Sequence, residues 1–231
     1  MSGHRPDEPF DPAASLRLIR EQQDRARAAT EPSGALLYLA WGLAWGIGYV
    51  CLYVGVDAAG QPAPWAFWVF FGAIALAVAF TVVHTVTRSA GTRGVSARQG
   101  VMYGWAWMLG FVTYGFVLGG LARAGAPDEV MALASNAFAC VVVGLLYLGG
   151  AVAFGAPRLY VVGVWILLVA GVATSVGVPH TYLVMATLGG GGFLLMAGVE
   201  HVLARRRRVG SRTPVARPGP AAASGTGARG A

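Results

Sequence analysis

Charge is scarce in this chain, and lysine is absent altogether. Only 12% of the 231 residues are charged, and all seventeen basic residues are arginine. Apolar residues make up 56% of the chain, and the mean hydropathy is +0.59. Long uncharged runs in a chain of such high hydropathy are typical of membrane proteins and exclude an ordinary soluble domain. We therefore predict an integral membrane protein.

The residue groupings that carry enzyme chemistry are also missing. Cys51 and Cys140 are the two cysteines, and they fall at depths about 9 Å apart along their apolar runs, which argues against a disulfide between them. No histidine or cysteine pair has metal-ligand spacing, and no nucleophile stands beside a base. The net charge of +7 comes from arginines that flank apolar runs, a pattern of membrane topology more than of nucleic-acid binding. We expect no enzyme activity, no metal, no cofactor and no nucleic-acid partner.

Six apolar runs are each long enough to cross a membrane as a helix, which takes about 20 residues for a hydrocarbon layer of about 30 Å. The predicted fold class is all-α, a bundle of six transmembrane helices over residues 34–204. A cytoplasmic segment (1–33) precedes this bundle, and a basic, disordered tail (205–231) follows it. The predicted spans are Ala35–Val56, Trp65–Val86, Val101–Leu121, Val130–Phe154, Leu159–Val178 and Thr181–Ala204. The short links "GAPR" and "VPH" predict that the last three are antiparallel neighbours.

The arginines predict the orientation of these spans. Sixteen of them lie in the N-terminal segment, the loop after the second span, the turn after the fourth and the C-terminal tail, whereas Arg123 alone lies on the other side. Short loops rich in arginine stay in the cytoplasm. We therefore predict a multi-pass membrane protein with both termini cytoplasmic. The run Arg205–Arg208 is expected to meet anionic lipid.

The segment before the first span carries its own helix signal. Asp11 and Pro12 are typical of a helix start, and the following residues can continue as a helix to about Ala29. Leu16 and Ile19 give this helix a thin apolar stripe. The segment is either a solvated juxtamembrane helix or a helix that docks on a partner or on the membrane surface.

Two stretches of the chain resemble each other. "WGLAWGIGYV" (41–50) and "YGWAWMLGFV" (103–112) share five of ten residues. Trp41, Trp45 and Gly48 lie on one face of a helix, and Tyr103, Trp107 and Gly110 repeat that spacing in the third span, with Tyr114 continuing the stripe. The echo indicates either an ancestral duplication or a shared packing face, with Trp45 packed between helices near the bilayer centre.

The last span contains four consecutive glycines, Gly189, Gly190, Gly191 and Gly192, at a depth near the bilayer centre. Successive residues of a helix point about 100° apart, so four glycines ring the helix. Either the helix is touched from several sides, or it bends there and forms a hinge or substrate path, as discontinuous helices of transporters do. On the packing hypothesis, alanine at Gly190 or Gly191 should destabilise the bundle.

Two further groups of polar residues are candidates for a site. Ser135 and Asn136, together with Thr113 and Tyr114, lie in the outer half of the bundle and form either interhelical hydrogen bonds or a polar pocket. His84, Glu200 and His201 lie at the cytoplasmic interface. There they form either pairs with Arg88 and Arg205–Arg208 or a proton-responsive or partner-binding cluster.

The stretches "LIREQQDRARAATEPSGALLYLAWGLAWGIGY", "YGWAWMLGF", "VVGVWILLVAG" and "YLVMATLGGGGFL" resemble a group of uncharacterised actinobacterial integral membrane proteins, sometimes loosely labelled transporters. The resemblance covers about residues 15–205. It implies a bacterial source and an inner-membrane location, and it assigns no substrate, cofactor or catalytic residue.

Two classes of function follow from these observations. The favoured one is a transporter-like protein, or the membrane component of a transport system that works with a separate ATPase subunit or as a homo-oligomer, and it is indicated by the glycine run and the two similar stretches. The alternative is a non-transport membrane protein for interaction or sensing, indicated by the basic N-terminal helix and by the absence of charge at the centre of every span. A wet path beside Gly189–Gly192 would indicate the first, and a dry, packed bundle the second.

Overall fold

The fold is all-α, as predicted. The computed structural model describes residues 12, 13, 15–20, 22, 32–58, 60–89 and 95–210. Residues 12, 13, 15–20 and 22 are helical, in keeping with the helix predicted before the first span, and the rest of that segment lies outside the described residues. The longer elements are α2 (Gly34–Val54), α3 (Pro64–Ser89), α4 (Val95–Arg123), α5 (Asp128–Phe154), α6 (Pro157–Val176), α7 (His180–Val184), the π-helix η1 (Met185–Gly190) and α8 (Gly191–Gly210).

Six helices of the described chain are long and apolar enough to cross a membrane, by length and composition, and α7, η1 and α8 together make the sixth. They coincide with the six predicted spans, so the chain is a multi-pass membrane protein. The helix ends follow the glycine and proline signals. Gly155 ends α5 in the left-handed conformation with φ of 62°, and Pro157 opens α6.

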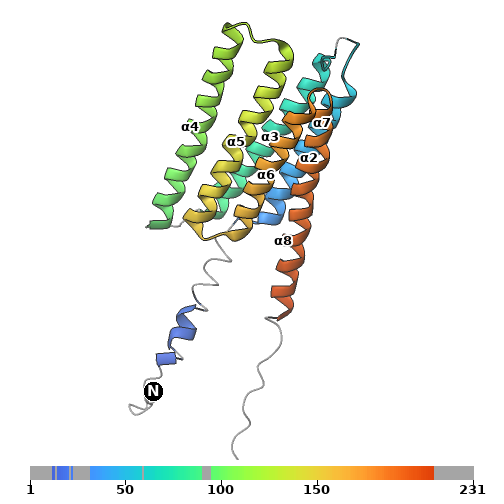
Figure 1. Cartoon of the computed structure of the whole chain (residues 1–231). Coiled ribbons are helices and arrows are strands. Elements are labelled where there is room, and N and C mark those ends of the chain that lie inside the picture. Colours follow the sequence, from blue (N-terminus) through green and yellow to red (C-terminus); the bar gives the residue numbers. More distant parts are fainter. Residues whose placement is uncertain are drawn as a thin grey trace, which may run out of the picture.

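The core of the bundle consists of α2, the sixth span (α7, η1 and α8), α6 and α5, and Figure 1 shows the bundle from the side. In this core α2 contacts α7, η1 and α8, these three contact α6, and α6 packs along the length of α5. The predicted side-by-side packing of the last three spans is thereby confirmed. α3 lies against α2, and α4 lies against α5. α4 stands at the edge of the molecule (Figure 1).

Close glycine contacts explain why α5 and α6 pack so tightly. A Cβ built on Gly163 would lie 2.9 Å from the carbonyl oxygen of Gly144, and one built on Gly144 would lie 2.6 Å from Leu167. Both distances are shorter than real side chains tolerate, so the two backbones approach only because these residues are glycine. This close glycine contact and the short link between α5 and α6 together hold the two helices antiparallel.

Two predicted boundaries differ from the observed ones by six residues, and the others differ by three residues or fewer. α4 begins at Val95 instead of Val101, and α8 continues to Gly210, so residues 205–210 of the predicted tail are helical. Arginine is a good helix former, and a helix that leaves the membrane can continue into water while its side chains are solvated. Residues 211–231 lie outside the described residues.

The start of α2, the α5–α6 turn and the end of α8 lie at one end of the bundle, together with the end of α3 and the start of α4 (Figure 1). Arg88, Arg98, Arg158, Arg205 and Arg206 belong to these segments. Arg123, at the end of α4, lies at the opposite end. The one-sided distribution of arginine along the chain is therefore also one-sided in space.

Candidate functional site

The glycine run lies where the sixth span changes its winding. Residues Met185–Gly190 form a π-helix, and the chain then continues as the α-helix α8 from Gly191. The indole N–H of Trp165, on α6, donates a hydrogen bond of 2.9 Å to the carbonyl oxygen of Leu188 within this turn. A π-turn loosens the regular backbone ladder and is frequent at functional sites. The helix widens here but remains continuous.

Three of the four glycines are packed against neighbouring helices. A Cβ on Gly189 would lie 2.8 Å from the ring of Trp45, and one on Gly190 would lie 2.7 Å from the backbone nitrogen of Gly46. A Cβ on Gly192 would collide with the indole of Trp165. The run therefore faces α2 on one side and α6 on the other, which agrees with the hypothesis that this helix is touched from several sides.

The fourth glycine differs from the others. Around a Cβ built on Gly191, no atom from elsewhere in the described chain lies within 4 Å. The contact that we expected at Gly191 is absent, because this residue lines an open hollow on the surface of the bundle. The prediction that Gly191→Ala destabilises the bundle is therefore withdrawn, whereas the one for Gly190→Ala stands.

A chain of aromatic rings fills the interior at the level of the glycines. Phe193 of α8 contacts Trp45 of α2 at a centroid distance of 5.2 Å and Tyr147 of α5 at 6.4 Å. Tyr147 contacts Trp107 of α4, and Trp45 contacts Tyr49. The chain thus links α4, α5, α8 and α2. Trp45 is 6% exposed, as expected for a residue packed between helices.

The two similar stretches each pack against the helix that follows them. In α2, the indole N–H of Trp41 donates to Oγ1 of Thr81 on α3, and Gly48 faces Phe70 of the same helix. In α4, Tyr103 donates to the carbonyl of Leu146 on α5, and Gly110 faces Val142. A shared packing face is therefore observed. The ancestral duplication stays a hypothesis.

The four residues predicted for an outer polar pocket behave differently from one another. The amide oxygen of Asn136 accepts a hydrogen bond of 2.5 Å from the hydroxyl of Tyr49, so α5 is linked to α2 in the buried outer half. Ser135 donates to the carbonyl of Ala132 in its own helix, Tyr114 is half-buried, and Thr113 is exposed. Within the described residues, the structure joins Asn136 to Tyr49 and gathers no pocket from the predicted four.

Glu200 makes an ion pair at the arginine-rich end of the bundle. Nη1 of Arg158, at the start of α6, lies 2.9 Å from both carboxylate oxygens of Glu200 on α8. Glu200 thus pairs with Arg158 in place of Arg88, Arg205 or Arg206, because the short α5–α6 link places Arg158 beside α8. The side chains of Arg207 and Arg208 lie outside the described residues. The carboxylate also lies next to Gly34, at the N-terminus of α2, where a negative charge is favoured.

His84 also reaches the start of α2. Its Nε2 atom accepts a hydrogen bond of 3.0 Å from the backbone N–H of Ser33, and its ring stacks on Phe80. His201 is exposed. The structure therefore brings His84 to Ser33 and Glu200 to Gly34, which are adjacent at the start of α2. His201 is not part of this pair. Among the described residues, no three histidine, cysteine or acidic side chains are grouped so that they could hold a metal ion.

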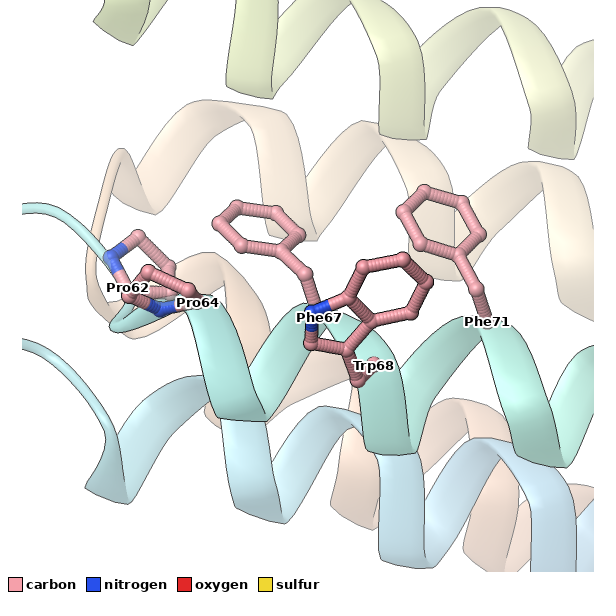
Figure 2. Close-up of a pocket in the computed structure, with 5 residues that line it drawn as sticks. All are labelled: Pro62, Pro64, Phe67, Trp68 and Phe71. Atoms are coloured by element: carbon pink, nitrogen blue, oxygen red, sulfur yellow. The ribbon is translucent and has the colours of Figure 1, made fainter.

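Two hollows among the described residues are open and lie on the outside of the bundle. One, of about 370 Å³, is formed by α3 and the loop before it, and Figure 2 shows the rings of Phe67 and Phe71 projecting from the same side of the helix. The other, of about 500 Å³, lies over Trp165, Thr187, Leu188, Gly191, Gly192, Leu194 and Leu195. Neither enters the core between α2, α5, α6 and α8.

Several residues of these contacts were not predicted as site residues. Tyr49, Arg158, Ser33 and Trp165 belonged to none of the candidate groups. A lone arginine in a very short interhelical link was the one available signal for Arg158. Comparisons with protein-family models, curated proteins and solved structures find no match for this chain.

Proposed function

We propose that this protein is a non-transport membrane protein for interaction or sensing, in which the helices form a packed scaffold for the cytoplasmic segments. The observation that carries the proposal is the filling of the core at mid-depth. Trp45 occupies the space at Gly189, the backbone of α2 occupies the space at Gly190, and Trp165 covers Gly192. A substrate path at this level requires these contacts to separate.

The cytoplasmic end supports the same proposal. The most polar contacts between helices lie there, where Arg158, Glu200 and His84 meet the first residues of α2. Ser33 is also the point at which the N-terminal 32 residues join the first span. A scaffold that holds this junction can report a change on one side of the membrane, or present the N-terminal segment to a partner.

Transport is the second candidate function, and the π-turn favours it. Met185–Gly190 depart from regular α-helix about 8–15 Å from the outer end of the sixth span, which approaches the depth at which many transporters bind substrate. In a transporter, Gly189–Gly192 would line the path after α2 and α6 move apart. The chain would then act as a membrane component beside a separate ATPase subunit or as a homo-oligomer.

The arginine distribution supports an inner-membrane location with cytoplasmic termini, since five of the described arginines gather at one end of the bundle. The resemblance to actinobacterial membrane proteins supports the same location. We expect the Arg205–Arg208 run to contact anionic lipid headgroups, because it leaves the membrane on that side.

Cysteine labelling in intact membranes tests the dry core. Cys140 is 2% exposed and lies one helical turn from Asn136 on the buried side of α5. In a Cys51→Ser background, a membrane-impermeant maleimide should leave Cys140 unlabelled from either side of the membrane until the protein is denatured.

The matched control is Cys51→Ser/Cys140→Ser/Ala124→Cys, since Ala124 is exposed in the turn after α4. This variant should be labelled quickly from the side opposite the arginine-rich end. Labelling of Cys140 at a comparable rate would reveal a water path in the outer half and would favour transport.

A further inference from the structure

The contact between α3 and the start of α2 depends on the protonation state of one side chain. The backbone N–H of Ser33 can only donate, so the Nε2 atom of His84 that lies 3.0 Å away must accept and carries no proton. This bond exists only while the imidazole is neutral, with its single proton on Nδ1. Stacking on Phe80, with ring centroids 5.4 Å apart, fixes the ring in this orientation.

The contact lies at a helix end that has few other partners. Ser33 is the N-cap of α2, its side chain makes no capping hydrogen bond, and the first turn contains no acidic residue. The first N–H groups of a helix lack partners within the helix and form the positive end of its dipole. His84 therefore supplies a hydrogen-bond acceptor at the N-terminus of α2. A neutral acceptor stabilises this helix end, whereas a cation would be repelled by it.

Other charged groups surround this junction. On α3, Arg88 lies one turn beyond His84 and adds positive charge. From α8, Glu200 lies beside Gly34, but Arg158 of α6 binds both of its oxygens at 2.9 Å and offsets much of its charge. On α2, the first ionisable side chain along the helix is Tyr38, which is buried. The surroundings thus offer a protonated His84 no uncommitted carboxylate among the described residues.

We propose that His84 is a proton-sensitive latch between α3 and the N-terminus of α2. In the neutral state the latch closes on the Ser33 amide. On acidification of that side of the membrane, the imidazolium loses its acceptor lone pair and is repelled by the helix end, so the first turn of α2 separates from α3. Histidine is the side chain whose charge most readily changes near neutral pH.

The inference deepens the proposed sensing function and rests on it, because the latch controls the residue at which the N-terminal segment enters the bundle. It does not depend on how the transmembrane core is packed. Labelling of Cys140 would overturn the dry scaffold and leave the latch standing, whereas the experiment below addresses the latch alone.

Hydrogen exchange of the peptide that contains Ser33 tests the latch in the full chain in lipid nanodiscs. Each exchange rate is divided by that of His84→Gln at the same pD, which cancels the intrinsic pH dependence of exchange. Glutamine keeps an acceptor near the position of Nε2 and does not titrate. We expect a ratio near one at pD 8 and a rise of roughly three- to tenfold at pD 5.5, as the loss of one hydrogen bond permits.

Two further variants bracket this result. His84→Phe keeps the stacking on Phe80 and removes the acceptor, so the Ser33 peptide should exchange fast at both pD values. His201→Gln changes the exposed histidine beside Glu200 and should behave as the wild type. A ratio that stays constant with pD, or a His84→Phe protein that matches the wild type at pD 8, would overturn the latch.

A measurement on the wild type covers the case in which the variants fail to fold. Nitrogen NMR of histidine-labelled protein reports which ring nitrogen carries the proton. At pH 8 the latch requires His84 to carry its proton on Nδ1, and a proton on Nε2 at that pH would contradict it.

Discussion

Trp45 occupies the space that the missing side chain of Gly189 leaves open. Its ring also contacts Phe193 and Tyr49, so one residue joins α2 to α8 and to the outer half of its own helix. Trp65, at the start of α3, is 48% exposed. The two tryptophans therefore provide a matched pair of a buried and a peripheral ring in the same protein.

We predict that Trp45→Ala lowers stability far more than Trp65→Ala. Truncating a buried tryptophan costs about 3–5 kcal/mol in soluble cores, although lipid can refill part of the gap. Thermal melting in a mild detergent measures the difference. Equal melting temperatures for the two variants would mean that Trp45 is not part of the packed core.

At the scale of the helices, hydropathy was sufficient to predict all six spans, and glycine and proline predicted where α5 ends and α6 begins. These signals depend on residue type alone. The rotation of each helix about its own axis cannot be predicted from residue type alone, because a span that is apolar on every face has no polar side to orient it. The partners of Trp165, Tyr49 and Glu200 depend on that rotation, and so they could not be predicted.

The π-turn illustrates the same limit for the candidate site. Four glycines predicted either close packing or a departure from regular helix, and Met185–Gly190 combine the two. Glycine permits the backbone of α2 to approach, and the indole N–H of Trp165 satisfies the Leu188 carbonyl within the widened turn. The sequence predicted a feature at Gly189–Gly192, but the winding of Met185–Gly190 depends on contacts from two other helices.

At the scale of the whole molecule, the orientation in the membrane follows from where the arginines gather. Reporter fusions after residues 94 and 210 should report the cytoplasm, and fusions after residues 60 and 125 the opposite side. The reason is that arginine-rich loops are retained in the cytoplasm. A reversed pattern would place His84, Glu200 and the N-terminal segment on the outer side and would contradict the proposed topology.

The sixth span lies between α2 and α6 at the centre of the molecule. Its glycines therefore test whether the helices are tightly packed there. Gly190 and Gly191 are adjacent and chemically identical, yet a Cβ would meet the backbone of Gly46 at the first and open space at the second. Gly190→Ala should therefore overpack the core, which typically costs about 1–3 kcal/mol. Gly191→Ala should be neutral or stabilising by up to about 1 kcal/mol, because alanine favours helix.

The thermal shift of Gly190→Ala relative to Gly191→Ala, measured in the same detergent, is the most direct test of a closed, packed centre. We expect a lower melting temperature for Gly190→Ala and an unchanged or higher one for Gly191→Ala. Stabilisation by both substitutions would show that the run is not packed against α2, and would identify the sixth span as a hinge beside a substrate path.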